Sequence, residues 1–172
     1  MIIKEIIGII GSGFVGSSVK FGFSSQTNCE ATILCYDKDP TKSQNSLEEV
    51  VAQSDIIFIS VPTPSNKDGS INLDIIKDVL DNVTKIEGHE DPIILLRSTV
   101  VPGTCNELSK IYPTLNIVFN PVFLTERSAK FDFINQTRYI LGGPNKDYLE
   151  KVANLYISRF GQHIPVVKTD YQ

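Results

Sequence analysis

Three glycines near the start of the chain have the spacing of a phosphate-binding turn. Gly11, Gly13 and Gly16 lie in the hexapeptide GSGFVG, between an apolar run over residues 6–10 and a segment over residues 14–25 that can wind as a helix. The apolar run predicts a buried strand. At such a corner the helix dipole and the free backbone N–H groups favour a pyrophosphate. Gly11 would permit the tight turn, Gly13 the approach of the phosphate, and Gly16 the close packing of helix on strand.

An acidic residue stands where a second contact to the nucleotide is expected. Residues 31–36 predict the next strand, and Asp37 follows it, 21 positions after Gly16. A dinucleotide-binding fingerprint places a carboxylate about 20 residues after its glycines. There it accepts hydrogen bonds from both ribose hydroxyls and repels a 2′-phosphate, so the expected cofactor is NAD rather than NADP. Without the glycines, Asp37 would be read equally well as a turn carboxylate.

Length, composition and charge narrow the class of protein. A chain of 172 residues with 41% hydrophobic and 21% charged residues suits one globular domain. The net charge of −4 argues against a nucleic-acid partner, which would require a basic face. Since no apolar run approaches the roughly 18 residues of a membrane span, no membrane partner is expected. The first residues also lack the pattern of a signal peptide.

Cysteines and histidines give no sign of a disulfide framework or a metal site. Cys29, Cys35 and Cys105 are odd in number and have no paired spacing. Cys35 lies within an apolar strand and is expected to be inert core. His89 and His163 are isolated, which favours surface positions over metal ligation. We therefore expect a reduced, cytoplasmic protein without a metal.

Strand and helix patterns alternate along the rest of the chain. This alternation predicts an α/β fold, a Rossmann-type doubly wound, mainly parallel sheet with helices on both faces. Asn72 is the expected N-cap of one of the helices. The predicted strands cover residues 56–61, 92–97, 115–119, 138–142 and 163–167, the helices cover 73–86, 102–111 and 146–160, and a polar loop covers 62–72.

Polar residues follow several of these strands and should therefore meet at one edge of the sheet. Right-handed crossovers bring the carboxyl ends of parallel strands together, and ligands bind there. Each residue alone is compatible with ordinary turn chemistry, and Ser98 or Thr99 would also suit the cap of a helix beginning near Gly103. The shared edge favours a binding role. The residues concerned are the glycine corner, Asp37, the stretch Val61-Pro62-Thr63-Pro64, the stretch Arg97-Ser98-Thr99, and Asn120-Pro121.

These stretches, in this order, resemble the N-terminal NAD-binding domain of the UDP-glucose/GDP-mannose dehydrogenase family. The resemblance runs along nearly all of residues 1–172, and it implies that the family's middle and C-terminal domains are absent from this chain. Members oxidise the C6 alcohol of a nucleotide sugar to a carboxylate with NAD. The stretches that carry the resemblance are GSGFVG at 11–16, VPTP at 61–64 with Asp68-Gly69, STVVPGT at 98–104, NPVFLTE at 120–126, and Asp132-Phe133 with Arg138 and Gly142.

The resemblance implies a role for each matching position. Thr99 would order a catalytic water, and Phe123 and Leu124 would lie against the nucleotide sugar, for example UDP-glucose. Lys42 stands where the family often has a basic residue near the adenosine ribose. Cofactor contacts would come from Gly11, Gly13, Phe14, Val15, Gly16, Asp37, Lys42, Val61, Pro62, Thr63, Ser98, Thr99 and Glu126.

Departures from the family pattern limit what this chain can do alone. Val122 stands where the family has a glutamate implicated in hydrolysis of the thioester intermediate, and valine can neither accept a proton nor position water. Arg127 replaces a common glycine. The nucleophilic cysteine of the family lies in a later domain, and none of the three cysteines here has its context. Because oxidation through a thiohemiacetal needs a positioned thiolate, full activity is not expected from this chain.

Three functional hypotheses follow from the sequence. The chain is the cofactor domain of a nucleotide-sugar dehydrogenase, completed by further sequence or by a second polypeptide. Alternatively, it is a free-standing, non-catalytic NAD-binding module, in which Val122 marks lost chemistry. A third hypothesis, a dehydrogenase of the β-hydroxyacid type, shares the glycine corner but is disfavoured by the Ser98-Thr99 and Asn120-Pro121 stretches.

Overall fold

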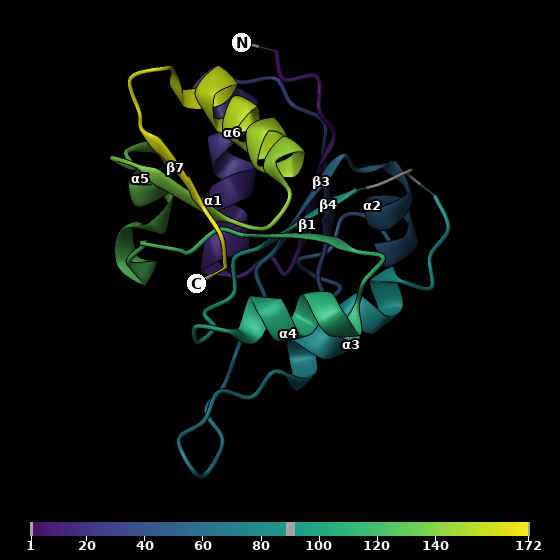
Figure 1. Cartoon of the computed structure of the whole chain (residues 1–172). Coiled ribbons are helices and arrows are strands. Elements are labelled where there is room, and N and C mark those ends of the chain that lie inside the picture. Colours follow the sequence, from purple (N-terminus) through teal and green to yellow (C-terminus); the bar gives the residue numbers. More distant parts are fainter. Residues whose placement is uncertain (1, 89–91, 172) are drawn as a thin grey trace.

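The protein is built on one seven-stranded sheet, seen edge-on in the computed structural model of Figure 1, which describes residues 2–88 and 92–171. The strand order is β2-β1-β3-β4-β5-β6-β7, and every neighbouring pair is parallel except β5 and β6. This arrangement confirms the predicted doubly wound, mainly parallel fold. The strands are β1 Ile7–Ile10, β2 Ile33–Tyr36, β3 Ile56–Ile59, β4 Ile93–Leu96, β5 Asn116–Phe119, β6 Tyr139–Gly142 and β7 Val166–Thr169.

Helices cover both faces of the sheet. In Figure 1, α1, α5 and α6 lie above the sheet, and α3 and α4 lie below it. Residues of α2, α3 and α4 share one buried cluster, so α2 belongs to the lower layer. The helices are α1 Phe14–Gly22, α2 Leu47–Gln53, α3 Asp74–Val83, α4 Thr104–Ile111, α5 Ala129–Ile134 and α6 Lys146–Phe160, with 3₁₀ turns η1 Ser25–Thr27 and η2 Glu126–Ser128.

The central strands are buried on both faces, as their continuous apolar sequences predict. Alternate residues of each strand enter different clusters. On β3, Ile56 and Phe58 pack against α1, α5 and α6, whereas Ile57 and Ile59 pack against the opposite helices. The upper cluster is rich in aromatic rings, and Phe23 contacts Phe58 with ring centroids 6.2 Å apart. The sheet is therefore a rigid platform whose carboxyl edge can present side chains with little freedom to move.

The first helix ends earlier than the sequence predicted, at Gly22 rather than near Ser25. The carbonyl oxygen of Gly22 accepts hydrogen bonds from Thr27 Oγ1 at 3.1 Å and from Arg159 Nε at 2.5 Å. A Cβ at Gly22 would also overlap the ring of Phe133. Side chains distant in sequence thus satisfy the end of α1, a feature that local periodicity does not contain.

Other boundaries also differ from their predictions, among them the end of α3, which lies at Val83 rather than at residue 86. The last strand is Val166–Thr169, not 163–167, because Pro165 has no N–H to give to the ladder and pairing with β6 begins after it. The N-cap of α3 is Leu73 rather than Asn72. Asn72 nevertheless lies one residue earlier and accepts a hydrogen bond from Asp74 N through Oδ1 at 2.8 Å. The short helices α2 and α5 were not predicted.

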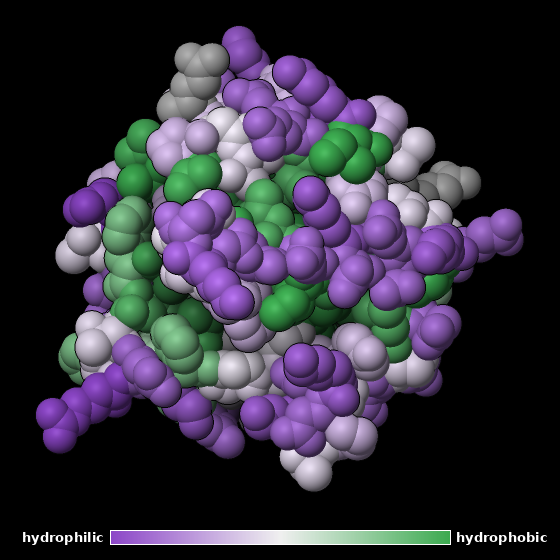
Figure 2. Space-filling model, turned by 90° about the horizontal axis from the view of Figure 1, so that it is seen from below, coloured by the Kyte–Doolittle hydropathy of each residue, from purple (hydrophilic) through white to green (hydrophobic). Residues whose placement is uncertain are grey.

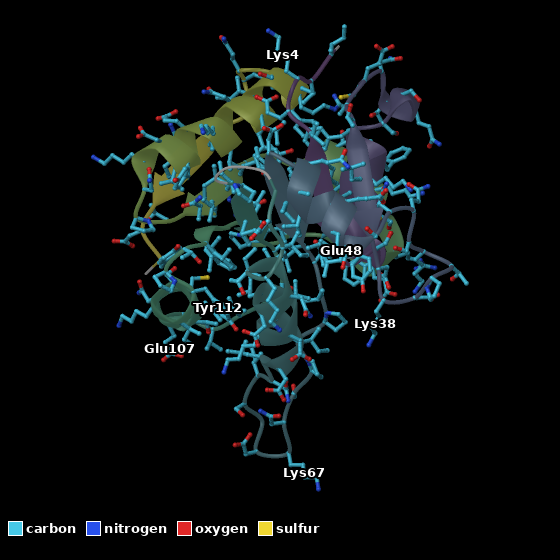
Figure 3. All side chains as sticks on the ribbon, turned by 90° about the vertical axis from the view of Figure 1, so that its right-hand side faces the viewer. Lys4, Lys38, Glu48, Lys67, Glu107 and Tyr112 are labelled. Atoms are coloured by element: carbon cyan, nitrogen blue, oxygen red, sulfur yellow. The ribbon has the colours of Figure 1, made fainter. Side chains whose placement is uncertain are left out.

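The loop over residues 62–72 projects from the body of the protein, with Lys67 at its tip (Figures 1 and 3). Asn66 N donates to Ser70 O at 2.7 Å, and Asp68 Oδ1 accepts from Ser70 Oγ at 2.6 Å. The hydrogen bonds that Asp68 accepts from the hydroxyl and the backbone N–H of Ser70 hold the pKa of its carboxyl below its ordinary value. The loop is therefore ordered by its own polar side chains rather than by packing on the core.

The surface carries many charges. The face seen in Figure 2 is largely hydrophilic, and its apolar areas are interrupted by hydrophilic side chains. In the part of the chain that the structure describes, no helix has the length and apolar character needed to cross a membrane.

Candidate functional site

The turn between β1 and α1 requires its glycines for steric reasons. Gly11 has a φ of 91°, and a Cβ there would lie 2.6 Å from the carbonyl oxygen of Ser60. Its N–H donates to Tyr36 O at 3.0 Å, which ties the turn to the end of β2. A Cβ on Gly16 would overlap the carbonyl oxygen of Gly11. These two glycines therefore serve the packing of the corner, as the sequence predicted.

The start of α1 is open. Gly13 is its N-cap, and apart from Gly13 and its two chain neighbours no described residue has an atom within 4 Å of the position that a Cβ on Gly13 would occupy. No side chain caps this helix. Its first backbone N–H groups, from Phe14 onward, are therefore available to a ligand, and the helix dipole favours a negative one. This geometry fits a pyrophosphate, because an anion can approach Gly13 without meeting a side chain.

Asp37 is held beside this corner. Its Oδ2 accepts a hydrogen bond from Ser12 N at 2.6 Å, and its Oδ1 accepts one from Asp39 N at 2.9 Å. Each carboxylate oxygen retains acceptor capacity for a ribose hydroxyl. Lys42, predicted to lie near the adenosine ribose, is close to Asp39, with its Nζ 3.6 Å from Asp39 Oδ2. The fold therefore brings the glycine corner and Asp37 together, as expected, and leaves Lys42 on the exposed side of the same loop.

Hydroxyl groups join the ends of β3 and β4. Ser98 Oγ donates to Val61 O at 2.7 Å and accepts from Val61 N at 3.1 Å, while Thr63 Oγ1 donates to Thr99 O at 2.9 Å. The alternative role for Ser98 and Thr99 as helix caps is wrong, because the N-cap of α4 is Gly103. The Ser98 hydroxyl is buried and both donates and accepts within the fold, whereas the side chain of Thr99 is exposed.

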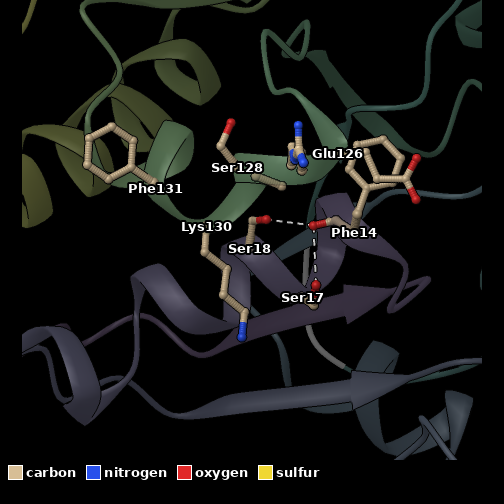
Figure 4. Close-up of a pocket in the computed structure, with 9 residues that line it drawn as sticks. Phe14, Ser17, Ser18, Glu126, Ser128, Lys130 and Phe131 are labelled. Atoms are coloured by element: carbon tan, nitrogen blue, oxygen red, sulfur yellow. Dashed lines mark hydrogen bonds between the residues drawn. The ribbon is translucent and has the colours of Figure 1, made fainter.

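The segment after β5 brings Glu126 toward the start of α1. A pocket of about 350 Å³ separates the first turns of α1 from η2 and α5 (Figure 4). Phe123 is 54% exposed, whereas Leu124 packs partly against the upper core. The pocket is lined by Phe14, Ser17, Ser18, Glu126, Arg127, Ser128, Ala129, Lys130 and Phe131. The predicted cofactor residues Phe14 and Glu126 thus line one cavity, which the sequence alone did not show.

The three cysteines are all buried and free of disulfide bonds. For Cys35 this agrees with the prediction that it lies in the core. Burial raises the pKa of the Cys105 thiol to about 12 and also raises that of Cys29. A thiol at such a pKa is not a nucleophile at neutral pH. His163 is exposed, and His89 lies outside the described residues. Within the described residues, no cluster of three or more His, Cys, Asp or Glu side chains is arranged to hold a metal.

Sequence reasoning missed one buried polar group next to the site. Tyr156 of α6 donates a hydrogen bond to Asn120 Oδ1 at 2.6 Å, and Arg97 also binds both residues. Burial raises the pKa of the Tyr156 hydroxyl, so it stays protonated and can donate. Nothing in the amphipathic pattern of residues 146–160 distinguishes Tyr156 from an ordinary core tyrosine.

Comparison with known sequences identifies the family of this chain. Residues 41–159 match the model of the NAD-binding domain of the UDP-glucose/GDP-mannose dehydrogenase family. The chain belongs to this family. It is 33% identical over 135 residues to UDP-glucose 6-dehydrogenase YwqF of Bacillus subtilis, covering 74% of this chain and 30% of the relative. It is 27% identical over 200 residues to UDP-glucose 6-dehydrogenase of Rickettsia typhi, covering 95% of this chain and 45% of the relative.

Solved structures agree on the fold. GDP-mannose dehydrogenase from Pseudomonas aeruginosa matches with a TM-score of 0.81 at 22% identity, over 96% of this chain and 46% of that one. UDP-glucose dehydrogenase from Pyrobaculum islandicum has a TM-score of 0.79 at 22% identity, over 96% of this chain and 46% of that one. The chain therefore carries the family's NAD-binding domain, and it spans less than half the length of these relatives.

Proposed function

We propose that this chain binds NAD along the carboxyl edge of the sheet and serves as the cofactor domain of a nucleotide-sugar dehydrogenase. The observation that carries the proposal is the open, uncapped start of α1 beside Asp37. The pyrophosphate would lie against the N–H groups of that first turn, and the adenosine ribose against the Asp37 carboxylate. The family assignment of residues 41–159 supports the same cofactor.

The nicotinamide half would extend toward the ends of β3 and β4 and the pocket that contains Glu126. Thr63 and Thr99 would line its path, and the exposed Thr99 hydroxyl would orient a water molecule. Phe123 would contact the nucleotide sugar. The chemistry that NAD would supply there is acceptance of a hydride from the alcohol carbon of the substrate. The residues of this chain would bind and orient the two reactants.

Completion of the oxidation to a carboxylate would need a thiolate from outside residues 1–172. The cysteines described above are buried, and the pKa of Cys105 is raised, so neither geometry nor acidity suits them to attack an aldehyde. Val122 supplies no carboxylate for thioester hydrolysis. We therefore infer that the nucleophile comes from further sequence of the same protein or from a second polypeptide. The free, unpaired thiols also favour a cytoplasmic location.

Calorimetric titration of the chain tests the proposal directly. NAD should bind at least tenfold more tightly than NADP, a difference of about 1.4 kcal/mol, because the Asp37 carboxylate repels a 2′-phosphate. The same sample should show no turnover of UDP-glucose. Equal affinities would contradict the role of Asp37, and failure to bind either cofactor would contradict the proposal as a whole.

A free-standing, non-catalytic NAD-binding module is the second candidate, and Val122 is the residue that favours it. These two functions can be distinguished by mixing the chain with a polypeptide that carries the remaining half of a relative. Turnover of UDP-glucose on mixing would support the dehydrogenase and exclude the module. NAD binding without turnover in every mixture would support the module.

A further inference from the structure

Arg97, at the end of β4, is a buried cation without a buried anion. Its side chain is 2% exposed, and its guanidinium carbon lies 5.9 Å and 5.4 Å from the ring centroids of Phe58 and Phe133. Among the described residues, no carboxylate forms an ion pair with it, and its Nε and Nη2 have no hydrogen-bond partner. A charge buried in this way is costly for folding, so its presence calls for a function other than stability.

Only the Nη1 atom of the Arg97 guanidinium is hydrogen-bonded, and it has two acceptors. It donates to Asn120 Oδ1 at 2.7 Å and to the Tyr156 hydroxyl oxygen at 2.9 Å. The Tyr156 hydroxyl donates to the same Asn120 oxygen at 2.6 Å, and Asn120 Nδ2 donates to Ile140 O at 2.8 Å. A single amide group therefore joins the ends of β4 and β5 to β6 and α6. Its orientation is fixed from both sides.

Asn120 is the residue from which the segment 121–128 departs, and this segment carries Glu126 and Phe123. The far end of the segment is held as well. Asp132 Oδ2 accepts hydrogen bonds from Thr125 N at 2.8 Å and from Ser128 Oγ at 2.9 Å. The segment thus runs between two anchors. Only the first contains a buried charge, which holds the amide without competition from water.

We propose that Arg97 and Tyr156 are positioning residues that, through Asn120, set the segment 121–128 against the nicotinamide half of NAD. This inference rests on the proposed function. The adenosine half is held by a different set of contacts, at Asp37 and the first turn of α1. Loss of the network should therefore weaken recognition of the nicotinamide and leave the adenosine site unchanged. A merely structural network would affect both halves alike.

The test compares Tyr156→Phe and Arg97→Met with the unmodified chain, using NAD and ADP-ribose as ligands in calorimetry. Each variant should lose about tenfold in NAD affinity and keep its ADP-ribose affinity within twofold. Saturation-transfer NMR on bound NAD should show a weaker signal for nicotinamide protons relative to adenine protons. Tyr139→Phe is the matched control. Tyr139 stacks on Tyr156 with centroids 3.9 Å apart, but its hydroxyl donates to Phe133 O and not to Asn120.

The possible outcomes separate this inference from the proposed function. If the unmodified chain binds neither ligand, both fail. If it binds both ligands and Tyr156→Phe leaves the ratio of affinities and the NMR ratio unchanged, or lowers both affinities equally, the positioning role alone is overturned. Should Arg97→Met fail to fold, Tyr156→Phe decides, because it removes one hydroxyl and leaves Arg97 bound to Asn120.

Discussion

The helices α1 and α2 differ in how the free backbone N–H groups of their first turns are treated: those of α2 are capped by side chains, and those of α1 are not. Every helix begins with backbone N–H groups that lack partners within the helix. At α2, Ser46 Oγ accepts a hydrogen bond from Glu49 N at 3.1 Å, and Glu49 Oε2 accepts one from Ser46 N at 2.9 Å. This reciprocal pair is a capping box. At α1, Gly13 occupies the N-cap and provides no side chain.

The difference shows which helix start is built for a ligand. A capping box such as that of α2 contributes about 1 kcal/mol to stability and leaves little for a ligand to bind. α1 lacks that stabilising cap. Its turn is nevertheless tightly packed, because there is no room for a side chain at Gly11 or Gly16. A helix start that is rigid but uncapped is stable only because its strand and its neighbours hold it. Its polar groups then remain available to an anion.

Gly16→Ala should have the largest effect, because it damages both the fold and the site. The new Cβ would overlap Gly11 O and lie 3.2 Å from Ile9 Cγ2, so helix and strand must separate. We expect a loss of about 3 kcal/mol in the free energy of unfolding and no measurable NAD binding. Urea denaturation and calorimetry measure the two effects. Wild-type stability in this variant would contradict the packing role of Gly16.

Gly13→Val should separate binding from folding. The backbone of Gly13, with φ −69° and ψ −162°, is extended and accessible to any residue, and open space surrounds the position of the new Cβ. Stability should therefore fall by at most about 1 kcal/mol. NAD affinity should fall at least 100-fold, or about 2.8 kcal/mol, because the side chain occupies the pyrophosphate position. Retained NAD affinity would show that the pyrophosphate lies elsewhere.

The contrast between these two helix starts also explains how much the sequence could reveal. The glycine corner and Asp37 were predictable because fixed spacing within 27 residues encodes them, and their chemistry is local. The capping box of α2 was equally local, with Ser46 and Glu49 at the required spacing, but the seven-residue helix after it is too short for a clear periodic signal.

Other features depend on contacts between distant residues and could not be predicted. Arg97, Asn120 and Tyr156 are separated by 23 and 36 positions, and only the fold brings them together. The pocket between Phe14 and Glu126 depends on the packing of α5 against α1, and α5 itself was missed. For the same reason Leu124 could not be distinguished from Phe123, although one packs partly on the core and the other is exposed.

Asp37→Asn should have an intermediate effect and extends the comparison to the second contact of the corner. The amide oxygen can still accept one hydrogen bond, so the turn is retained, but the charge that repels a 2′-phosphate is lost. NAD affinity should fall about tenfold, and the preference for NAD over NADP should largely disappear. Calorimetric titrations with NAD and with NADP measure both the affinity and the preference. A preference that survives the substitution would assign cofactor choice to another residue.

Ser46→Ala should have the smallest effect. In contrast to Gly13→Val, it should lower stability and leave NAD binding unchanged. Removal of the hydroxyl leaves Glu49 N without its cap and should lower the free energy of unfolding by about 1 kcal/mol, with NAD affinity unchanged. Glu49→Gln is the matched control, because its amide oxygen can still accept from Ser46 N. If Ser46→Ala weakened NAD binding as strongly as Gly13→Val does, the two helix starts would not be functionally distinct. The α2 capping box would then act on the site through the loop over residues 37–45, which joins Asp37 to the start of α2.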